Sequence, residues 1–302
     1  MKNVVYSGID NLPRGKASDH LTQGCLVLEG GAFRGVYTSG VLDALMEADI
    51  NIACTIGVSA GAMNGMNYTA GQIGRSGRIN LTYRHDPRYV GLKAIQANRG
   101  IIGFDFLMDG VETWEPFDWD AFNRPERRFV AVATNCLTGQ TEYFEKGTGV
   151  DIRKAVQASA SMPYVSEPVD VDGIPYLDGG CSVKIPLRWA MDQGFEKIVV
   201  VRTRPSGFRS KVKERSRHLA QRVYRGYPAF AEVLGGTAQR YNQLCGELEL
   251  LRRSGRVFVI SPSSHFTVSR LEKDMEKLGA FYYLGYNDGK DQLDALKAYL
   301  EA

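Results

Sequence analysis

A serine between two glycines stands at the junction of an apolar run and a run of small residues. Residues 52–57 are mostly apolar, and residues 57–61 read Gly-Val-Ser-Ala-Gly. In a strand-to-helix turn of this kind, Gly57 and Gly61 give the backbone room to turn, and the Ser59 hydroxyl projects from the sheet. The helix N-terminus behind it stabilises negative charge. The spacing predicts a nucleophile at Ser59; the alternative is a glycine-rich helix entry with Ser59 as its N-cap.

A second glycine-rich turn lies one strand earlier. The apolar run 25–29 leads into Gly30-Gly31-Ala32-Phe33-Arg34-Gly35 and then into a helical pattern. Small residues let backbone N–H groups converge on an anion at the helix N-terminus. The turn is either an oxyanion hole for a tetrahedral intermediate or a degenerate dinucleotide loop. A dinucleotide loop requires an acidic residue at the end of the next strand; that strand leads into Ser59 instead, which favours the oxyanion hole.

A serine nucleophile needs a base, and the chain offers two kinds of candidate. His218 and His265 are isolated histidines without a local signature. Asp178-Gly179-Gly180 follows the segment 174–177, and its glycines leave the carboxylate uncrowded. An Asp-Gly-Gly sequence in isolation is typical of a turn. Beside the two glycine-rich turns, it makes Asp178 a candidate general base.

Strands that alternate with helical patterns must position these residues. Apolar runs predict strands at 25–29, 52–57, 129–134, 197–202 and 256–260, with a hairpin partner at 141–144. Helical patterns predict helices at 35–48, 152–159, 186–193, 216–252, 269–285 and 288–300. A further helix of small residues is expected directly after residues 59–61, ending at about residue 70. This alternation predicts a mostly parallel α/β sandwich.

The composition is that of an ordinary globular chain. Its 302 residues are 44% hydrophobic and 24% charged with a net charge of +3, which excludes disordered and fibrous classes. No apolar run approaches the roughly 18 residues of a spanning helix, and the first 20 residues lack the apolar stretch that is typical of a signal peptide, so we expect a cytoplasmic protein. The five scattered cysteines and four isolated histidines favour neither disulfides nor a metal site; Cys25 and Cys54 are expected to be small buried hydrophobes.

Charge is unevenly distributed along the chain. Residues 202–225 hold nine Lys or Arg against one acid, and residues 105–120 hold six acids and no base, interleaved with aromatics. Solvated surfaces are the simplest interpretation of both. The basic block also predicts attraction to an anionic surface such as phospholipid head groups. No nucleic-acid motif accompanies it, so no nucleic acid is expected as a partner.

The ordered set of blocks resembles the patatin-like phospholipase family of bacterial serine lipid acyl hydrolases. The family pattern G-G-G-x-R/K-G is matched at 30–35, G-x-S-x-G at 57–61 and D-G-G/A at 178–180, and between them stand the family-like A-S-x-x-x-P of 158–163 and the turn 134–139. The resemblance covers residues 24–193 as a catalytic core, with 194–302 as a C-terminal α/β extension that completes the same domain. Ala32 replaces the third glycine of the family pattern.

The resemblance implies a fold and a mechanism. The fold is a patatin-like three-layer α/β/α sandwich with a mostly parallel central sheet. The activity is hydrolysis of fatty-acyl esters of phospholipids or lysophospholipids through a Ser59–Asp178 dyad and an acyl-enzyme, without metal, calcium or other cofactor. The implied oxyanion loop comprises Gly30, Gly31, Ala32 and Arg34, and the nucleophile elbow is framed by Gly57 and Gly61. Arg34 either braces its loop through a salt bridge or contacts an anionic head group.

Two other classes of function stay open at this point. One is an acyltransferase or thioesterase on the same scaffold, in which His218 or His265 serves as the base. The other is a non-catalytic lipid- or nucleotide-binding module that keeps the loops without turnover. The basic block Arg202–Arg225 further predicts peripheral contact with an anionic membrane surface, at the inner face of the membrane.

Overall fold

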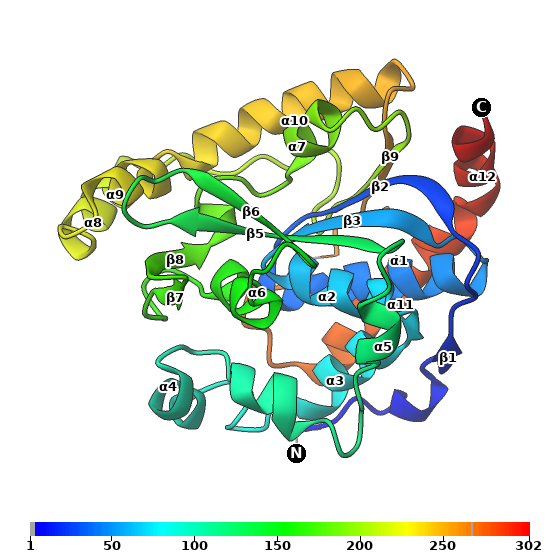
Figure 1. Cartoon of the computed structure of the whole chain (residues 1–302), viewed down its shortest axis with the longest axis horizontal. Coiled ribbons are helices and arrows are strands. Elements are labelled where there is room, and N and C mark those ends of the chain that lie inside the picture. Colours follow the sequence, from blue (N-terminus) through cyan, green and yellow to red (C-terminus); the bar gives the residue numbers. More distant parts are fainter. Residues whose placement is uncertain (1–3, 267) are drawn as a thin grey trace.

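A mixed β-sheet forms the centre of the computed structural model, which describes residues 4–266 and 268–302. Within these residues eight strands pair in the order β10-β9-β2-β3-β5-β8-β7, and β6 adds to β5 (Figure 1). The strands of this sheet are β2 (Thr22–Leu28), β3 (Ile52–Val58), β5 (Arg128–Asn135), β6 (Thr141–Glu145), β7 (Val169–Val171), β8 (Ile174–Asp178), β9 (Ile198–Val201) and β10 (Phe258–Ile260). A small separate ladder joins β1 (Gly15–Lys16) to β4 (Gln72–Ile73).

The half of the sheet from β10 to β5 is parallel, whereas β6, β7 and β8 join antiparallel. Parallel strands that are covered on both faces need continuous apolar sequence. Cys25 and Val27 of β2 pack into the core on one face, and Leu26 and Leu28 pack into the core on the other. The predicted burial of Cys25 and Cys54 is therefore confirmed.

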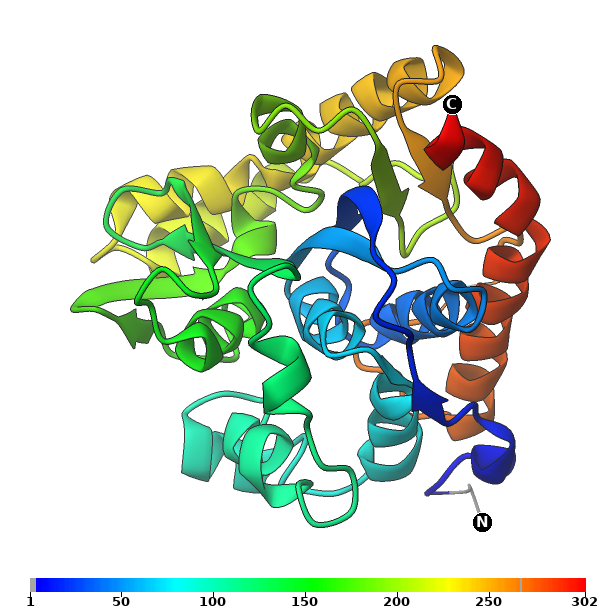
Figure 2. The ribbon, with the colours of Figure 1, turned by 45° about the vertical axis from the view of Figure 1, so that its right-hand side comes forward.

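Helices cover both faces of the sheet (Figures 1 and 2). One layer includes α1, α2, α3 and α11, and the opposite layer includes α7 and α10, so the predicted three-layer α/β/α sandwich with a mostly parallel central sheet is confirmed. The helices are α1 (Gly35–Glu47), α2 (Ala60–Thr69), α3 (Arg75–Tyr83), α4 (Leu92–Asn98), α5 (Trp119–Phe122), α6 (Ile152–Ala160), α7 (Leu187–Asp192), α8 (Glu214–Val223), α9 (Pro228–Gly235), α10 (Thr237–Arg253), α11 (Met275–Asp291) and α12 (Leu293–Glu301).

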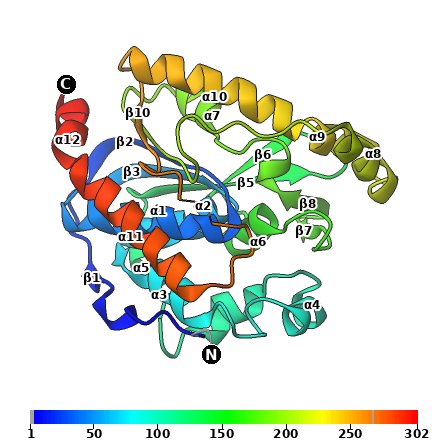
Figure 3. The same cartoon turned by 180° about the vertical axis from the view of Figure 1, so that it is seen from behind.

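The C-terminal region completes the same sheet and the same core. Strand β9 pairs with β2, and α11 lies along α1 (Figure 3). Two buried tyrosines fix this helix pair: the Tyr282 hydroxyl donates to Asp43 Oδ2 at 2.6 Å, and the Tyr37 hydroxyl donates to Asp288 Oδ2 at 2.8 Å. The boundary expected after residue 193 stays a prediction.

The helix expected over 216–252 is wrong as a single element. The chain instead forms α8, α9 and α10. Pro228 stands in the first turn of α9, where its missing N–H costs nothing but where a continuing helix is excluded. The Gly235-Gly236 pair then separates α9 from α10. The helix expected at 269 begins at Met275, because the Asp274 carboxylate caps it by accepting from the Lys277 N–H at 3.0 Å.

Across the described residues, the structure contains no helix both long enough and apolar enough to cross a membrane.

Candidate active site

Ser59 occupies the turn between β3 and α2 in a strained conformation. Its φ of 57° and ψ of −124° are unusual for a residue with a side chain. The hydroxyl Oγ donates to Asp178 Oδ2 at 2.7 Å, and the Ser59 N–H donates to Ser159 Oγ at 2.9 Å. Both side chains of the Ser59–Asp178 pair are largely buried. The strain is therefore held in place by partners from two other elements, α6 and β8.

Close backbone approach explains the glycines on either side of Ser59. A Cβ added to Gly61 would lie 2.5 Å from the carbonyl oxygen of Leu28, and one added to Gly57 would lie 2.4 Å from the carbonyl carbon of Gly61. Because these neighbours are backbone atoms, they cannot swing aside as a flexible side chain could. The turn between β3 and α2 therefore forms without displacement only with glycine at both positions.

We expect Gly61→Ala to destabilise the fold by about 1–3 kcal/mol and to displace Ser59, since α2 must move away from β2 to admit a methyl group. Gly246→Ala is the matched control, because Gly246 lies in α10 and nothing lies within 4 Å of an added Cβ there. That control is expected to stabilise the protein by about 0.5–1 kcal/mol. Thermal unfolding measures both, and a Gly61→Ala variant as stable as wild type would contradict the argument.

Asp178 ends strand β8 and faces Ser59 from the other half of the sheet. Its Oδ1 accepts from the Gly180 N–H at 2.7 Å, and its own N–H donates to the Ser161 carbonyl at 2.9 Å. Burial raises the pKa of the carboxyl, and the hydrogen bonds from Ser59 and Gly180 and the charges of Arg270 and Lys184 act against that rise. The net result is a raised pKa, which makes the carboxylate a stronger base than a solvated aspartate.

The glycine-rich turn lies beside Ser59 and is partly committed to other contacts. The Gly30 N–H donates to the Lys184 carbonyl at 3.3 Å, and the Phe33 N–H donates to the Arg270 carbonyl at 3.1 Å. The N–H groups of Gly31 and Ala32 have no partner among the described residues. Ala32 adopts a φ of 50°, the left-handed region in which glycine is unstrained.

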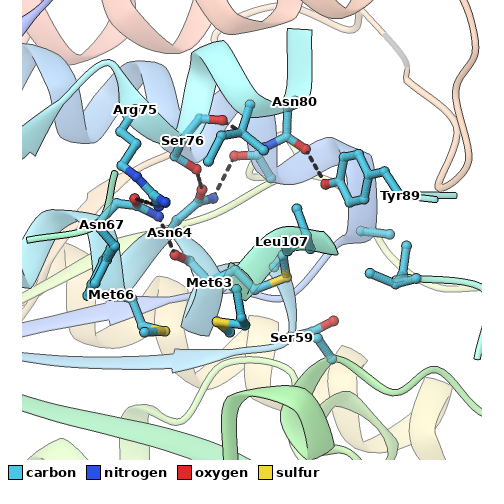
Figure 4. A pocket seen from close by; sticks show the side chains of 18 of the residues that line it. Ser59, Met63, Asn64, Met66, Asn67, Arg75, Ser76, Asn80, Tyr89 and Leu107 are labelled. Atoms are coloured by element: carbon cyan, nitrogen blue, oxygen red, sulfur yellow. Dashed lines mark hydrogen bonds between the residues drawn. The ribbon is translucent and has the colours of Figure 1, made fainter. Parts of the chain in front are cut away.

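An apolar pocket opens from Ser59 into the layer of α2 and α3 (Figure 4). Its walls near the serine include Phe33, Met63, Leu107 and Met162. Its far end is polar. There the Asn64 side-chain oxygen accepts from Ser76, the Arg75 guanidinium donates to Asn67 Oδ1 at 2.8 Å, and the Tyr89 hydroxyl donates to Asn80 Oδ1 at 2.9 Å.

The acidic-aromatic segment 105–120 forms one wall of this apolar pocket through Leu107, Met108, Phe117 and Trp119. Four of its six carboxylates pair with cations outside the basic block. Glu115 binds Arg78 at 2.7 Å, Asp109 binds Arg153, and Asp118 binds Lys16 at 2.5 Å. The segment is therefore part of the site's wall, a role that its charge pattern did not indicate.

A second cavity, the cationic cleft, meets the apolar pocket at Ser59, Ala32 and Met162, which line both. We define the cleft by its six lining cations, which are Arg34, Lys184, Arg204, Lys211, Lys213 and Arg270. Arg34 forms no salt bridge among the described residues, and its buried Nε has no hydrogen-bond partner. Of the two alternatives for Arg34, the salt bridge that braces the loop is not formed among the described residues, and Arg34 lines the cleft.

The basic block 202–225 does not form one surface. Arg202 is buried and contacts Tyr241 Oη at 3.2 Å and Cys245 Sγ at 3.3 Å. Arg204 lines the cationic cleft, and Arg217 pairs with Glu232 on α9. The two histidine candidates, His218 and His265, are exposed, and no histidine lines either cavity in the part of the chain that the structure describes.

Several residues at the site carried no sequence signal of their own. The buried Glu29 carboxylate accepts from the Thr203 N–H and from the Tyr241 hydroxyl, both at 2.6 Å, and so ties the glycine-rich turn to β9 and α10. Ser159, which supports Ser59, stood inside the A-S-x-x-x-P block without an assigned role. Lys184 and Arg270 reach the site from a loop after Asp178 and from the segment before α11.

The fold and the site define an α/β protein with a Ser–Asp pair at the carboxyl end of a mostly parallel sheet. A family model with the description "Patatin-like phospholipase" matches residues 26–191 of the chain. The chain belongs to the patatin-like phospholipase family. A second family model, described as a domain of unknown function (DUF6363), matches residues 227–301.

Named relatives are only partly covered by this chain. The uncharacterized protein YjjU of Escherichia coli is 31% identical over 188 residues, which are 60% of this chain and 52% of that protein. The lysophospholipase nte1 of Aspergillus terreus is 31% identical over 172 residues, 51% of this chain and 10% of that protein. The crystal structure of VipD from Legionella pneumophila aligns with a TM-score of 0.46 and 14% identity over 98% of this chain and 71% of VipD. The chain thus spans about half the length of YjjU.

Proposed function

We propose that this protein is a serine acyl hydrolase that cleaves fatty-acyl esters of phospholipids or lysophospholipids. The observation that carries the proposal is the 2.7 Å hydrogen bond from Ser59 Oγ to Asp178 Oδ2, at the point where the apolar pocket meets the cationic cleft. An ester with an acyl chain on one side and a charged group on the other fits that junction. The family and the name of the Aspergillus relative, a lysophospholipase, support the same class of substrate.

In the proposed mechanism, Asp178 accepts the Ser59 proton as Oγ attacks the ester carbonyl carbon. The carbonyl oxygen becomes an oxyanion, and the Gly31 and Ala32 N–H groups, which have no partner among the described residues, are the donors that we propose for it. When the tetrahedral intermediate collapses, the C–O bond to the leaving alcohol breaks and Asp178 returns the proton to that oxygen. The acyl group stays on Ser59.

Water completes the cycle. Asp178 takes a proton from a water molecule that attacks the acyl-enzyme carbonyl, and it then returns this proton to Ser59 Oγ as the fatty acid leaves. The same carboxyl serves both halves of the reaction because no histidine lines the site in the described part of the chain. This argues for hydrolysis with an aspartate base, as opposed to the histidine-dependent acyltransferase alternative.

Incubation of a mixed lipid extract with the protein tests the proposal. Wild type is expected to release free fatty acids and to deplete particular phospholipids or lysophospholipids, and Ser59→Ala is expected to leave the extract unchanged. Mass spectrometry of the lipids reads both results. An extract that wild type leaves unchanged would contradict the proposed substrate class.

We further propose that α8 makes peripheral contact with an anionic membrane surface. Leu219 and Val223 are exposed one turn apart on α8, with 50% and 49% of their surface accessible, and Arg215 and Arg222 are exposed beside them. Apolar side chains that insert and cations that attract together favour an anionic lipid surface.

Replacing both apolar residues, Leu219→Ser with Val223→Ser, is expected to lower binding to phosphatidylglycerol vesicles by about tenfold. Co-sedimentation measures it, with phosphatidylcholine vesicles as the neutral surface. Leu250→Ser is the matched control, because Leu250 is exposed on α10 at 69%. Equal loss with the control variant would assign the effect to general hydrophobicity and contradict a role of α8.

A further inference from the structure

Several positive charges of the cationic cleft have no negatively charged partner within the part of the protein that the structure describes. Among the described residues, the side chains of Arg34, Lys184, Arg204 and Arg270 form no salt bridge and no hydrogen bond to the protein. Arg34 is only 7% exposed, yet its Nε is unpartnered. A buried guanidinium without a partner costs free energy. The arrangement is that of a binding site for an anion.

These cations also lie close enough to perturb one another. Burial, Arg204 and Arg270 together lower the pKa of Arg34 to about 10. Burial and the charge of Arg270 lower the pKa of Lys184 to about 8, with Arg34 adding to the effect. Neighbouring positive charges that depress each other's pKa are relieved by a bound negative charge.

The cleft offers little to a positively charged head group. Its two carboxylates are engaged, since Glu29 is bound by Thr203 and Tyr241 and Asp178 is bound by Ser59 and Gly180. An ammonium group could also bind an aromatic face. However, two aromatic rings of the cleft already contact cations of the protein. Lys184 Nζ lies 4.8 Å from the Tyr241 ring centroid, and Arg204 Cζ lies 4.4 Å from the Phe208 ring centroid.

We infer that the cationic cleft selects ester substrates whose head group carries a net negative charge, a phosphate without a compensating ammonium, over zwitterionic head groups. Arg204 and Arg270 are the specificity-determining residues. Both lie outside residues 26–191, so the C-terminal region supplies this selectivity. The inference rests on the proposed ester hydrolysis at Ser59 and deepens it.

The test uses three soluble esters with the 302-residue chain. Dihexanoyl phosphatidylglycerol is anionic, dihexanoyl phosphatidylcholine is zwitterionic, and p-nitrophenyl hexanoate is uncharged; all are used as monomers, so that no lipid surface contributes. Wild type is expected to show at least a tenfold higher kcat/KM for the glycerol head group than for the choline head group, about the discrimination that one charge-assisted hydrogen bond provides.

In the double variant Arg204→Gln with Arg270→Gln, we expect this ratio to fall by about tenfold. The control is Arg14→Gln with Lys297→Gln, which removes two exposed charges that line neither cavity and is expected to keep the wild-type ratio. The single variant Arg270→Gln changes an exposed side chain, so it retains the fold and should shift the ratio in the same direction.

The outcomes are distinguishable. Three results would overturn the head-group inference and leave ester hydrolysis standing. They are a wild-type ratio near one, hydrolysis of the uncharged ester but of neither phospholipid, and a ratio that the variants leave unchanged. No hydrolysis of any of the three esters by wild type overturns the proposed function, and the inference falls with it.

Discussion

Replacing Ser59 with alanine is expected to lower ester hydrolysis by at least about a thousandfold, because the reaction then has no nucleophile. The hydroxyl donates a single side-chain hydrogen bond, to Asp178 Oδ2, so its loss should leave the fold intact. The variant keeps the strained backbone at residue 59, the glycine-rich turn and both cavities. Hydrolysis of p-nitrophenyl hexanoate and thermal unfolding, measured side by side, separate lost chemistry from lost structure.

Ser254→Ala is the matched control for this prediction. Ser254 is an exposed serine at the end of α10, and its hydroxyl donates to the Leu251 carbonyl at 3.0 Å. That variant is expected to hydrolyse the ester at the wild-type rate. A folded Ser59→Ala variant that retains full hydrolysis would show that another residue is the nucleophile.

The second large effect is expected at Asp178→Asn. An asparagine keeps one oxygen that can accept from the Gly180 N–H, and its NH2 group can donate to Ser59 Oγ, but it cannot take a proton at neutral pH. We expect the rate of hydrolysis to fall by about a thousandfold or more while the variant remains folded. Asp151→Asn is the control, since Asp151 only caps α6. An Asp178→Asn variant with near wild-type kcat would remove Asp178 from the role of base.

The pH dependence of wild-type activity tests the ionisation of the Asp178 carboxyl independently. The base must be ionised, and burial raises its pKa in the folded protein. Activity is therefore expected to be present above that raised pKa and to be lost as the pH falls through it, at a pH above the usual aspartate value of about 3.9. An acid limb at or below that value would contradict a desolvated Asp178.

The parts of the site that the sequence predicts are those that form locally. Each of the glycine-rich turns lies within a few residues of the strand that delivers it, so composition and spacing carry the information. The contact between Ser59 and Asp178 is not local, because the two residues are 119 positions apart in sequence and the pairing of β8 with β5 brings them together. Only the ordered set of blocks, not any single one, indicated that pairing.

The basic block shows why a charge run alone misleads. Arg202 and Arg204 are two residues apart, yet Arg202 is buried beside Tyr241 and Cys245 while Arg204 lines the cationic cleft. Local composition cannot tell such positions apart, since what decides them is the packing of α10 against β9. Arg270, the cation from the segment before α11, gave no local signal.

Helix α3 was not predicted for a related reason. Its arginines, Arg75 and Arg78, are buried, although arginines are expected at exposed positions. They are satisfied by the segment 105–120, where Arg75 donates to the Glu115 carbonyl at 2.7 Å and Arg78 binds the Glu115 carboxylate. Because these partners lie some 40 residues away, the local sequence of α3 does not indicate that its arginines are buried.

Labelling with a fluorophosphonate, followed by mass spectrometry of the peptides, tests the central claim most directly. The phosphonyl group is expected on Ser59 in wild type, at a rate much reduced in Asp178→Asn, and on no residue in Ser59→Ala. Such a result would establish an activated nucleophile at the turn between β3 and α2. A wild-type protein that hydrolyses esters but carries the label on another residue, or carries none, would contradict the account.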